Sequence, residues 1–199
     1  MAAPVHPLSS ARLVTTRIAA GTLCHHLFLD RYLDPLGFGY SPSRFSDPRR
    51  RPRERFGVYY VGATFEVAFL ETIVRDAKNQ NPGTLLISSY DLDRYVHVEV
   101  VVRAPLELVD LRGGNAIVMG ISTDAVRARS HLSGRRTSLA LYQHPDRPDG
   151  ICYPSRLNQD ENIAIYDRAV HKLDARPRRR LSRCPELAPV LDRYRIAIV

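Results

Sequence analysis

Residues 59–76 read YYVGATFEVAFLETIVRD and hold the change from an apolar strand to the best-defined helix of the chain. β-branched and aromatic residues predict a strand over residues 55–62. Thr64 can cap the free N–H groups of a following helix, and Glu66 lies in its first turn. We predict that helix over residues 64–78, because apolar residues recur there at the spacing of one buried face.

The flanking segments predict short elements in irregular order. Strands are expected over residues 22–29, 85–90, 96–102, 150–153, 162–166 and 196–199, and an apolar run covers 106–111. Helices are expected over residues 123–129, 137–144 and 185–194, and residues 34–46, dense in Gly, Pro and Ser, form a loop. Because strands and helices do not alternate regularly, the order favours an α+β fold with short strands in a mixed or antiparallel sheet.

Length and composition are those of one globular domain with a real core. The chain has 199 residues, of which 44% are hydrophobic and 25% charged. We divide it into an N-terminal arm (residues 1–20), a central domain (21–175) and a basic linker with a closing helix and strand (176–199). Three scattered cysteines form no disulfide framework or metal-ligand spacing, and no apolar run approaches a membrane span. With no secretory pattern at its start, we expect a cytoplasmic protein.

The positive charge is concentrated in two runs. Net charge is +8 and the pI is about 9.7, with much of the excess in residues 49–55 and 176–183. A basic chain suggests an anionic partner, such as nucleic acid, a phosphate-rich small molecule or an acidic protein. Two solvated loops are the favoured interpretation. Direct nucleic-acid binding is not favoured, because few aromatic residues lie beside the basic ones.

Glu71 is the first candidate for chemistry. It lies in a helix that is apolar nearly all round, where a carboxylate needs a partner or a task. An ion pair with Arg75, four residues on, is an equally good structural explanation. Arg44, in the tight loop SPSRFS (residues 41–46), can fork onto a carboxylate or phosphate, although a surface arginine is the commoner case.

Other candidates lie at strand ends. Tyr59 and Tyr60 must face opposite sides of their strand, and one of them can stack on a flat ring. Ser155 and Arg156 follow a short strand, where functional groups often project into clefts, although a capping serine is the simpler reading. His25 and His26 point to opposite faces and have no HExxH or CxxC companion, so we expect no metal site. The chain has no P-loop, GxGxxG or GxSxG motif.

Taken together, these motifs resemble the RES domain, the toxin of Xre–RES toxin–antitoxin pairs. The first strand contains TLCH (residues 22–25), the loop ends in Arg44–Phe45, the strand and helix carry Tyr60 and Glu71, and DGICYPSR spans residues 149–156. These motifs occur in the family's order from about residue 21 to 168. The resemblance implies a compact fold like that of ADP-ribosyltransferases, with a split sheet around an NAD cleft and flanking helices.

The resemblance also implies residue roles. Glu71, Tyr60 and Ser155 would be catalytic, while Arg44, His25, Arg31, Ser138 and Arg156 would bind NAD. The family often has Arg where this chain has His25, and a neutral histidine supplies less charge, which Arg44, Arg31 or Arg156 could replace. Ser155 fits the family's SR motif, but Ser133 and Ser138 are alternatives for the working serine.

The implied activity is cleavage of the nicotinamide–ribose bond of NAD⁺, which is the substrate, without a metal. Hydrolysis or phosphorolysis is favoured over transfer of ADP-ribose to a protein, and a catalytically weak RES relative acting as a binding protein is a further alternative. The expected partners are NAD⁺ and an Xre-like antitoxin. A homo-oligomer is compatible with the sequence, and a membrane partner is not expected.

Overall fold

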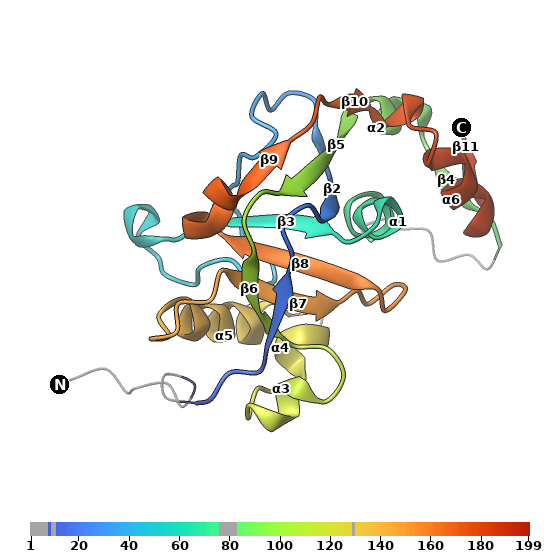
Figure 1. Cartoon of the computed structure of the whole chain (residues 1–199). Helices are drawn as coiled ribbons and strands as arrows, with labels where there is room; N and C mark the ends of the chain where they lie inside the picture. The colour runs from blue at the N-terminus through green and yellow to red at the C-terminus, as the bar shows by residue number, and fades with distance from the viewer. Residues whose placement is uncertain (1–7, 9–10, 76–82, 129) are drawn as a thin grey trace.

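The computed structural model describes residues 8, 11–75, 83–128 and 130–199 and has the predicted α+β architecture (Figure 1). Its main sheet has the strand order β1-β6-β7-β8-β3-β2-β5-β10, with β9 also paired to β5. Only β6 and β7 are parallel among these pairs. The strands are β1 (Thr15–Ile18), β2 (Leu23–Leu29), β3 (Val58–Gly62), β5 (Tyr95–Val102), β6 (Leu106–Asp110), β7 (Gly150–Pro154), β8 (Glu161–Tyr166), β9 (Leu173–Ala175) and β10 (Arg179–Arg180).

The sheet curls and opens between β2 and β3. These strands are in register at His25 and Gly62, whereas β2 pairs with β5 along its whole length. Beyond that point the His26 Nδ1 donates to the carbonyl oxygen of Tyr60 at 2.7 Å, so a side chain replaces the backbone ladder. The opening corresponds to the split sheet that the family resemblance implied, and helix α1 (Phe65–Phe69) begins directly beside it.

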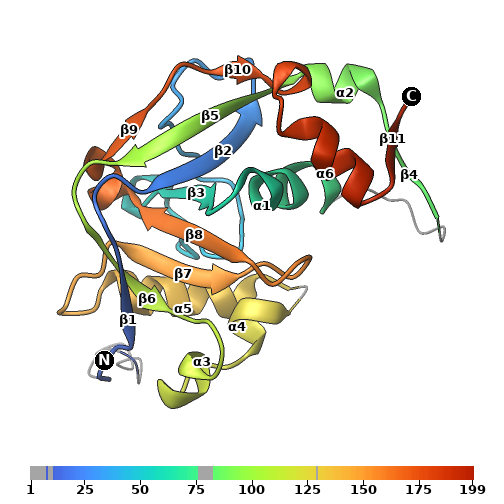
Figure 2. The same ribbon diagram turned by 45° about the vertical axis from the view of Figure 1, so that its right-hand side comes forward.

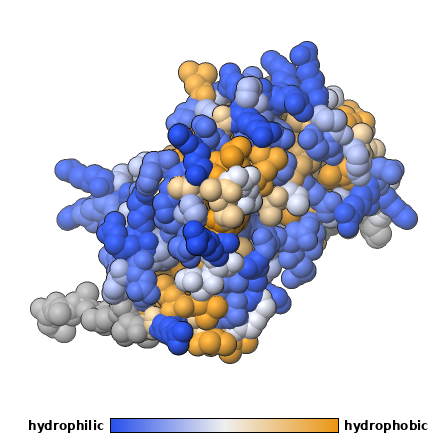
Figure 3. Space-filling model, in the orientation of Figure 1, coloured by the Kyte–Doolittle hydropathy of each residue, from blue (hydrophilic) through white to orange (hydrophobic). Residues whose placement is uncertain are grey.

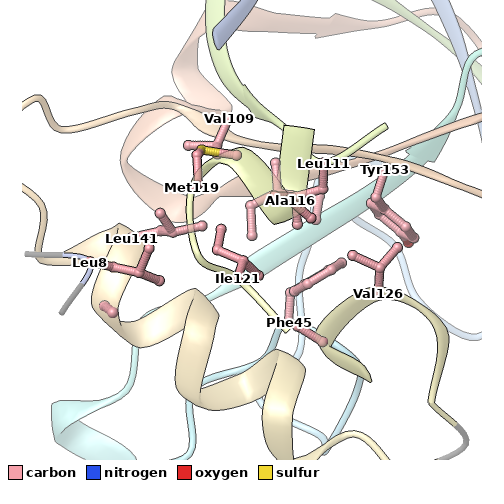
Figure 4. Packing of buried hydrophobic residues seen from close by; sticks show 14 of the residues in the cluster. Leu8, Phe45, Val109, Leu111, Ala116, Met119, Ile121, Val126, Leu141 and Tyr153 are labelled. Atoms are coloured by element: carbon pink, nitrogen blue, oxygen red, sulfur yellow. The ribbon is translucent and has the colours of Figure 1, made fainter. Parts of the chain in front are cut away.

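Two groups of helices cover the sheet (Figures 1 and 2). Helices α3 (Asn115–Val118), α4 (Asp124–Arg127) and α5 (Leu132–Tyr142) lie together beside β6 and β7. Their core includes Phe45, Val126 and Tyr153, whose side chains converge in Figure 4. Helices α2 (Ser89–Asp93) and α6 (Leu187–Arg193) lie with α1 over a second cluster, next to the small parallel sheet of β4 (Leu85–Ile87) and β11 (Ile196–Ile198).

The predicted helix over residues 64–78 is present but changes its winding. Thr64 caps it as predicted, since its side chain accepts a hydrogen bond from the Val67 N–H at 3.2 Å. After α1 the chain continues as a π-helical turn, Leu70–Val74, and the Arg75 N–H bonds to the Leu70 carbonyl. Residues 76–78 of the prediction lie outside the described residues.

Other predictions need correction. The strand expected over residues 85–90 ends at Ile87, and the serines and Asp91 that follow form α2 instead. Part of the N-terminal arm, Thr15–Ile18, is an edge strand that pairs with β6. Helix α5 begins at Leu132 rather than at residue 137, because its polar first turn packs against the loop of Arg44.

The two basic runs are largely exposed, as expected, but some of their arginines are tied to the fold. Arg178 bonds to the backbone at Asp30 and Tyr32, and Arg49 pairs with the buried Asp47. The face of the molecule in Figure 3 is mostly polar. An apolar area lies over α3, where Ile117 and Val118 are exposed. Within the described residues, no helix is long and apolar enough to cross a membrane.

Candidate active site

A cavity of about 250 Å³ opens where the sheet splits. One wall is the helical segment with Ala68, Glu71 and Thr72, and the floor comes from the ends of β2 and β3. The opposite side comes from the loop of Arg44 and from the end of β7 with its following turn. Its lining residues are His25, His26, Leu27, Ser43, Arg44, Tyr60, Val61, Gly62, Ala68, Glu71, Thr72, Arg75, Tyr153, Pro154, Arg156 and Asn162.

Glu71 lies on the π-helical turn, a feature often found at functional sites. Its Oε1 accepts hydrogen bonds from the Ser155 hydroxyl at 2.7 Å and from the Asn162 amide at 3.2 Å. Its Oε2 is 3.7 Å from Arg75 Nη1, so the ion pair considered from sequence is also present. The carboxylate is therefore a tethered group in the cavity wall, with partners on two sides.

Ser155 lies behind Glu71 rather than in the open cavity. It is 1% exposed, and its hydroxyl oxygen accepts from the Leu157 N–H at 3.1 Å while it donates to Glu71. Arg156, the next residue, does line the cavity. Of the three serines considered from sequence, Ser155 is the one that contacts Glu71.

Tyr60 faces the cavity, and Tyr59 faces the core behind the sheet, as their alternation requires. The Tyr60 hydroxyl bonds to the Ser43 hydroxyl at 2.8 Å and accepts from the Phe45 N–H at 3.0 Å. Burial raises the pKa of Tyr60, so the phenol stays protonated. Both bonds flank Arg44, and Tyr60 thereby fixes the loop that carries this arginine.

Arg44 is held by helix α5 on its other side. Its guanidinium donates to the Ala128 carbonyl at 2.9 Å. Its backbone packs closely against Gly134: a Cβ added to Gly134 would lie 2.5 Å from the Arg44 carbonyl oxygen. Burial lowers the pKa of Arg44, and the nearby positive charge of Arg156 adds to this effect. Arg44, Arg75 and Arg156 thus gather positive charge in one cavity, an arrangement that attracts an anion.

His25 lines the cavity but does not supply the positive charge of the arginine in the family pattern. Its ring stacks on His97 with Nδ1 and Nε2 3.0 Å apart and meets the edge of Phe65. Burial lowers the pKa of His25, and it lowers the pKa of His26 and of His97 to about 4. These rings are therefore neutral at pH 7 and add no charge to the cavity.

Two predicted binding residues lie elsewhere. Arg31 belongs to a separate depression with Asp30 and Arg94, and its guanidinium lies over the Tyr32 ring. Ser138 is fully buried in α5, where its hydroxyl donates to the Phe45 carbonyl at 2.7 Å. This hydrogen bond anchors the helix to the Arg44 loop. Ser133 lines another depression beside α5.

Sequence reasoning did not find Asn162, Ser43 or His26 as site residues. Asn162 is 4% exposed and directly precedes the apolar run of β8, so a polar residue at that place was a usable signal. Ser43 and His26 carried no such signal, because their partners are the hydroxyl and the backbone carbonyl of Tyr60, 17 and 34 residues away in the chain.

Comparison with known proteins identifies the family to which this chain belongs. The RES domain model matches residues 18–185, and the chain belongs to the RES domain family.

Among curated proteins, the chain is 38% identical to the probable toxin y4kH of Sinorhizobium fredii over 127 residues, which are 63% of this chain and all of the relative. Among solved structures, it resembles a chain of the M. tuberculosis MbcT–MbcA toxin–antitoxin complex with a TM-score of 0.63 and 15% identity, over 90% of this chain and 91% of that one. This likeness confirms the predicted α+β fold.

Proposed function

We propose that this protein is a toxin that cleaves the nicotinamide–ribose bond of NAD⁺. The observation that supports this most strongly is the Glu71 carboxylate, tethered in the wall of a cavity that also gathers three guanidinium groups. NAD⁺ presents both charges that such a cavity complements: a ribose that becomes cationic as nicotinamide leaves, and an anionic diphosphate.

The chemistry follows from these charges. Nicotinamide leaves as a neutral amide, so the barrier lies in the oxocarbenium-like ribose. A carboxylate beside the ribose stabilises that cation and can hold its 2′-hydroxyl, which is the role we assign to Glu71. Arg44 and Arg156 would bind the diphosphate, and the Tyr60 ring would pack on the ribose or nicotinamide.

The size of the cavity supports this orientation. At about 250 Å³ it is smaller than the 300–1,000 Å³ typical of pockets that enclose a whole ligand. It suits the nicotinamide–ribose end of the dinucleotide, with the remainder lying along the Arg44 loop. Water or phosphate is the acceptor we favour over a protein side chain.

The partner follows from the relatives. One relative bears the name probable toxin, and the similar solved chain belongs to a toxin–antitoxin complex. We propose that this chain is likewise neutralised by a dedicated antitoxin protein of the Xre-like type, inside the cytoplasm.

The test is to incubate the pure protein with NAD⁺ and follow free nicotinamide. We expect release by the parent and none by Glu71→Gln, which keeps the shape of the side chain and removes its charge. Glu107→Gln, which changes an exposed glutamate paired with Arg17, is the matched control and should retain full activity. Nicotinamide release by Glu71→Gln at the parental rate would contradict the assignment. Expression without an antitoxin should stop bacterial growth and drain NAD⁺, and normal growth with steady NAD⁺ would favour an inactive relative.

A further inference from the structure

Asn162 occupies a place that only the folded chain reveals. It is the second residue of β8, where it pairs with Gly62 of β3 on one side and Tyr153 of β7 on the other. Its side chain is 4% exposed, lines the cavity and donates to Glu71 Oε1 at 3.2 Å. Since strands flank it on both sides, Asn162 is one of the most firmly placed side chains near Glu71.

The same carboxylate oxygen receives a second donor. Ser155 donates to Glu71 Oε1 at 2.7 Å. Its hydroxyl oxygen already accepts from the Leu157 N–H, so its one hydrogen is available for Glu71. Two neutral donors, one on β8 and one on the turn after β7, thus converge on a single oxygen.

This convergence sets the orientation of Glu71. A glutamate has three rotatable bonds, and ordering them costs conformational entropy unless partners fix the group. With Oε1 occupied by two donors, Oε2 is the oxygen on the side of Arg75, which also lines the cavity. A carboxylate that is held in place before the substrate arrives needs little reorganisation during the reaction. Preorganised groups stabilise the charge of a transition state for this reason.

We propose that Asn162 is a positioning residue that, with Ser155, holds the Glu71 carboxylate so that Oε2 faces the ribose. Ser155 then acts through Glu71 rather than by touching the nicotinamide carboxamide. The catalytic part of this inference rests on the proposed NAD⁺ cleavage, while the orientation of Glu71 is a property of the protein alone. The two parts can therefore be tested separately.

The first experiment needs no substrate. Protein labelled with ¹³C at the glutamate carboxyl carbons is examined by NMR, and the Glu71 resonance is assigned from its loss in Glu71→Gln. We expect this resonance to move in Asn162→Ala and in Ser155→Ala. The matched control is Asn158→Ala. Asn158 donates at 3.2 Å to the carboxylate of Glu66, which lies five residues before Glu71 on the same helical segment. It should move the Glu66 resonance and leave that of Glu71 in place. A Glu71 resonance that stays in place in Asn162→Ala would overturn the proposal.

The second experiment measures nicotinamide release. Loss of one hydrogen bond to a charged group should lower kcat roughly tenfold or more in Asn162→Ala. KM should stay within about twofold, because the diphosphate contacts are unchanged. A raised KM with an unchanged kcat would overturn the catalytic part.

Asn162→Leu covers the case in which Asn162→Ala does not fold. It keeps the branched shape of the side chain and adds no charge but removes the amide donor, so a merely space-filling role predicts parental kcat, whereas positioning predicts a loss. If the Glu71 resonance moves in the variants but the parent releases no nicotinamide, the proposed function is refuted, while the orientation of Glu71 is supported.

Discussion

At the scale of single residues, the site depends on side chains that other side chains hold in place. The Tyr60 hydroxyl is bonded to Ser43 and to the Phe45 N–H, on either side of Arg44. Its hydroxyl is thus engaged in structure, and the ring face remains for a ligand. Arg44, the arginine that Tyr60 supports, is the residue that we propose binds the diphosphate most directly.

Arg44→Ala should weaken NAD⁺ binding by about 1.5–3 kcal/mol, the range for a hydrogen bond to a charged group. The reason is that Arg44 lines the cavity and is fixed there by Ala128 and Gly134. Calorimetry on the inactive Glu71→Gln background measures this without turnover. Arg31→Ala is the control, because Arg31 lies in a separate depression, and it should bind as its parent does. If NAD⁺ affinity changed equally in Arg44→Ala and Arg31→Ala, the diphosphate site would have to lie elsewhere.

His25→Arg tests the position where this chain departs from the family pattern. His25 stacks on His97 beside Phe65, and burial lowers its pKa, so an arginine there places a permanent charge among partly buried rings. We expect a loss of about 1–3 kcal/mol in stability with no gain in NAD⁺ affinity. His171→Arg, on an exposed histidine, should change neither quantity. Tighter NAD⁺ binding by His25→Arg would mean that a charge at this position in the cavity lining reaches the ligand.

At the scale of elements, strands β2 and β5 make stability depend on pH. The pKa of His26 and of His97 is about 4 in the folded chain, below the ordinary 6.5, so the unfolded chain binds more protons between these values. The stabilising contribution is complete above about pH 6.5 and decreases as the pH falls toward 4. The melting temperature should therefore fall between pH 7 and pH 5.

Helix α5 was only partly predictable from sequence, and the reason is physical. Its first turn holds Ser133 and Gly134, which are weak helix formers. Contact with the Arg44 loop compensates: Ser138 donates to the Phe45 carbonyl, and Arg135 donates to the Asp47 carbonyl. The apolar spacing of α1 was visible in the sequence because it is local. Long-range partners such as Asn162 with Glu71 were not.

Gly134→Ala measures this contact between α5 and the loop. Alanine favours a helix over glycine by about 1 kcal/mol, but its Cβ would lie 2.5 Å from the Arg44 carbonyl oxygen and 2.7 Å from that of Ala125. Backbone atoms cannot move aside cheaply, so we expect the variant to be destabilised and to bind NAD⁺ more weakly. Gly114→Ala is the control, since a Cβ there meets nothing within 4 Å. A thermal melt in which Gly134→Ala is as stable as Gly114→Ala would argue against the close packing.

At the scale of the whole molecule, the C-terminal segment supports the helix of Glu71. Residues after 185 lie outside the family match, yet Leu187, Val190 and Ile196 pack in the same cluster as Phe65 and Phe69 of α1. Figure 2 shows α6 beside α1. The segment is therefore part of the packed fold and not an appendage.

A polar contact at Glu66 joins this segment to the site. Its carboxylate accepts from the Tyr194 hydroxyl at 2.5 Å, from Arg193 at 2.9 Å and from Asn158 on the turn after β7 at 3.2 Å. Burial alone would raise the pKa of Glu66, but these donors outweigh it and lower the pKa below its usual range. One carboxylate on α1 thus connects the C-terminal helix with the turn that carries Ser155.

Tyr194→Phe removes one of these donors while preserving the ring. A hydrogen bond to a charged acceptor contributes about 1.5–3 kcal/mol, which corresponds to a fall in melting temperature of roughly 3–10 °C for a chain of this length. We expect NAD⁺ affinity to change little, because Tyr194 packs against the cluster under α1 and α6 and is not among the residues that line the cavity. Tyr90→Phe provides the control, since Tyr90 is 72% exposed and its ring contact with Arg94 survives the change. If both variants melted with the parent, the C-terminal segment would be held by its apolar contacts and its pairing with β4, and the Glu66 contact would contribute nothing measurable to stability.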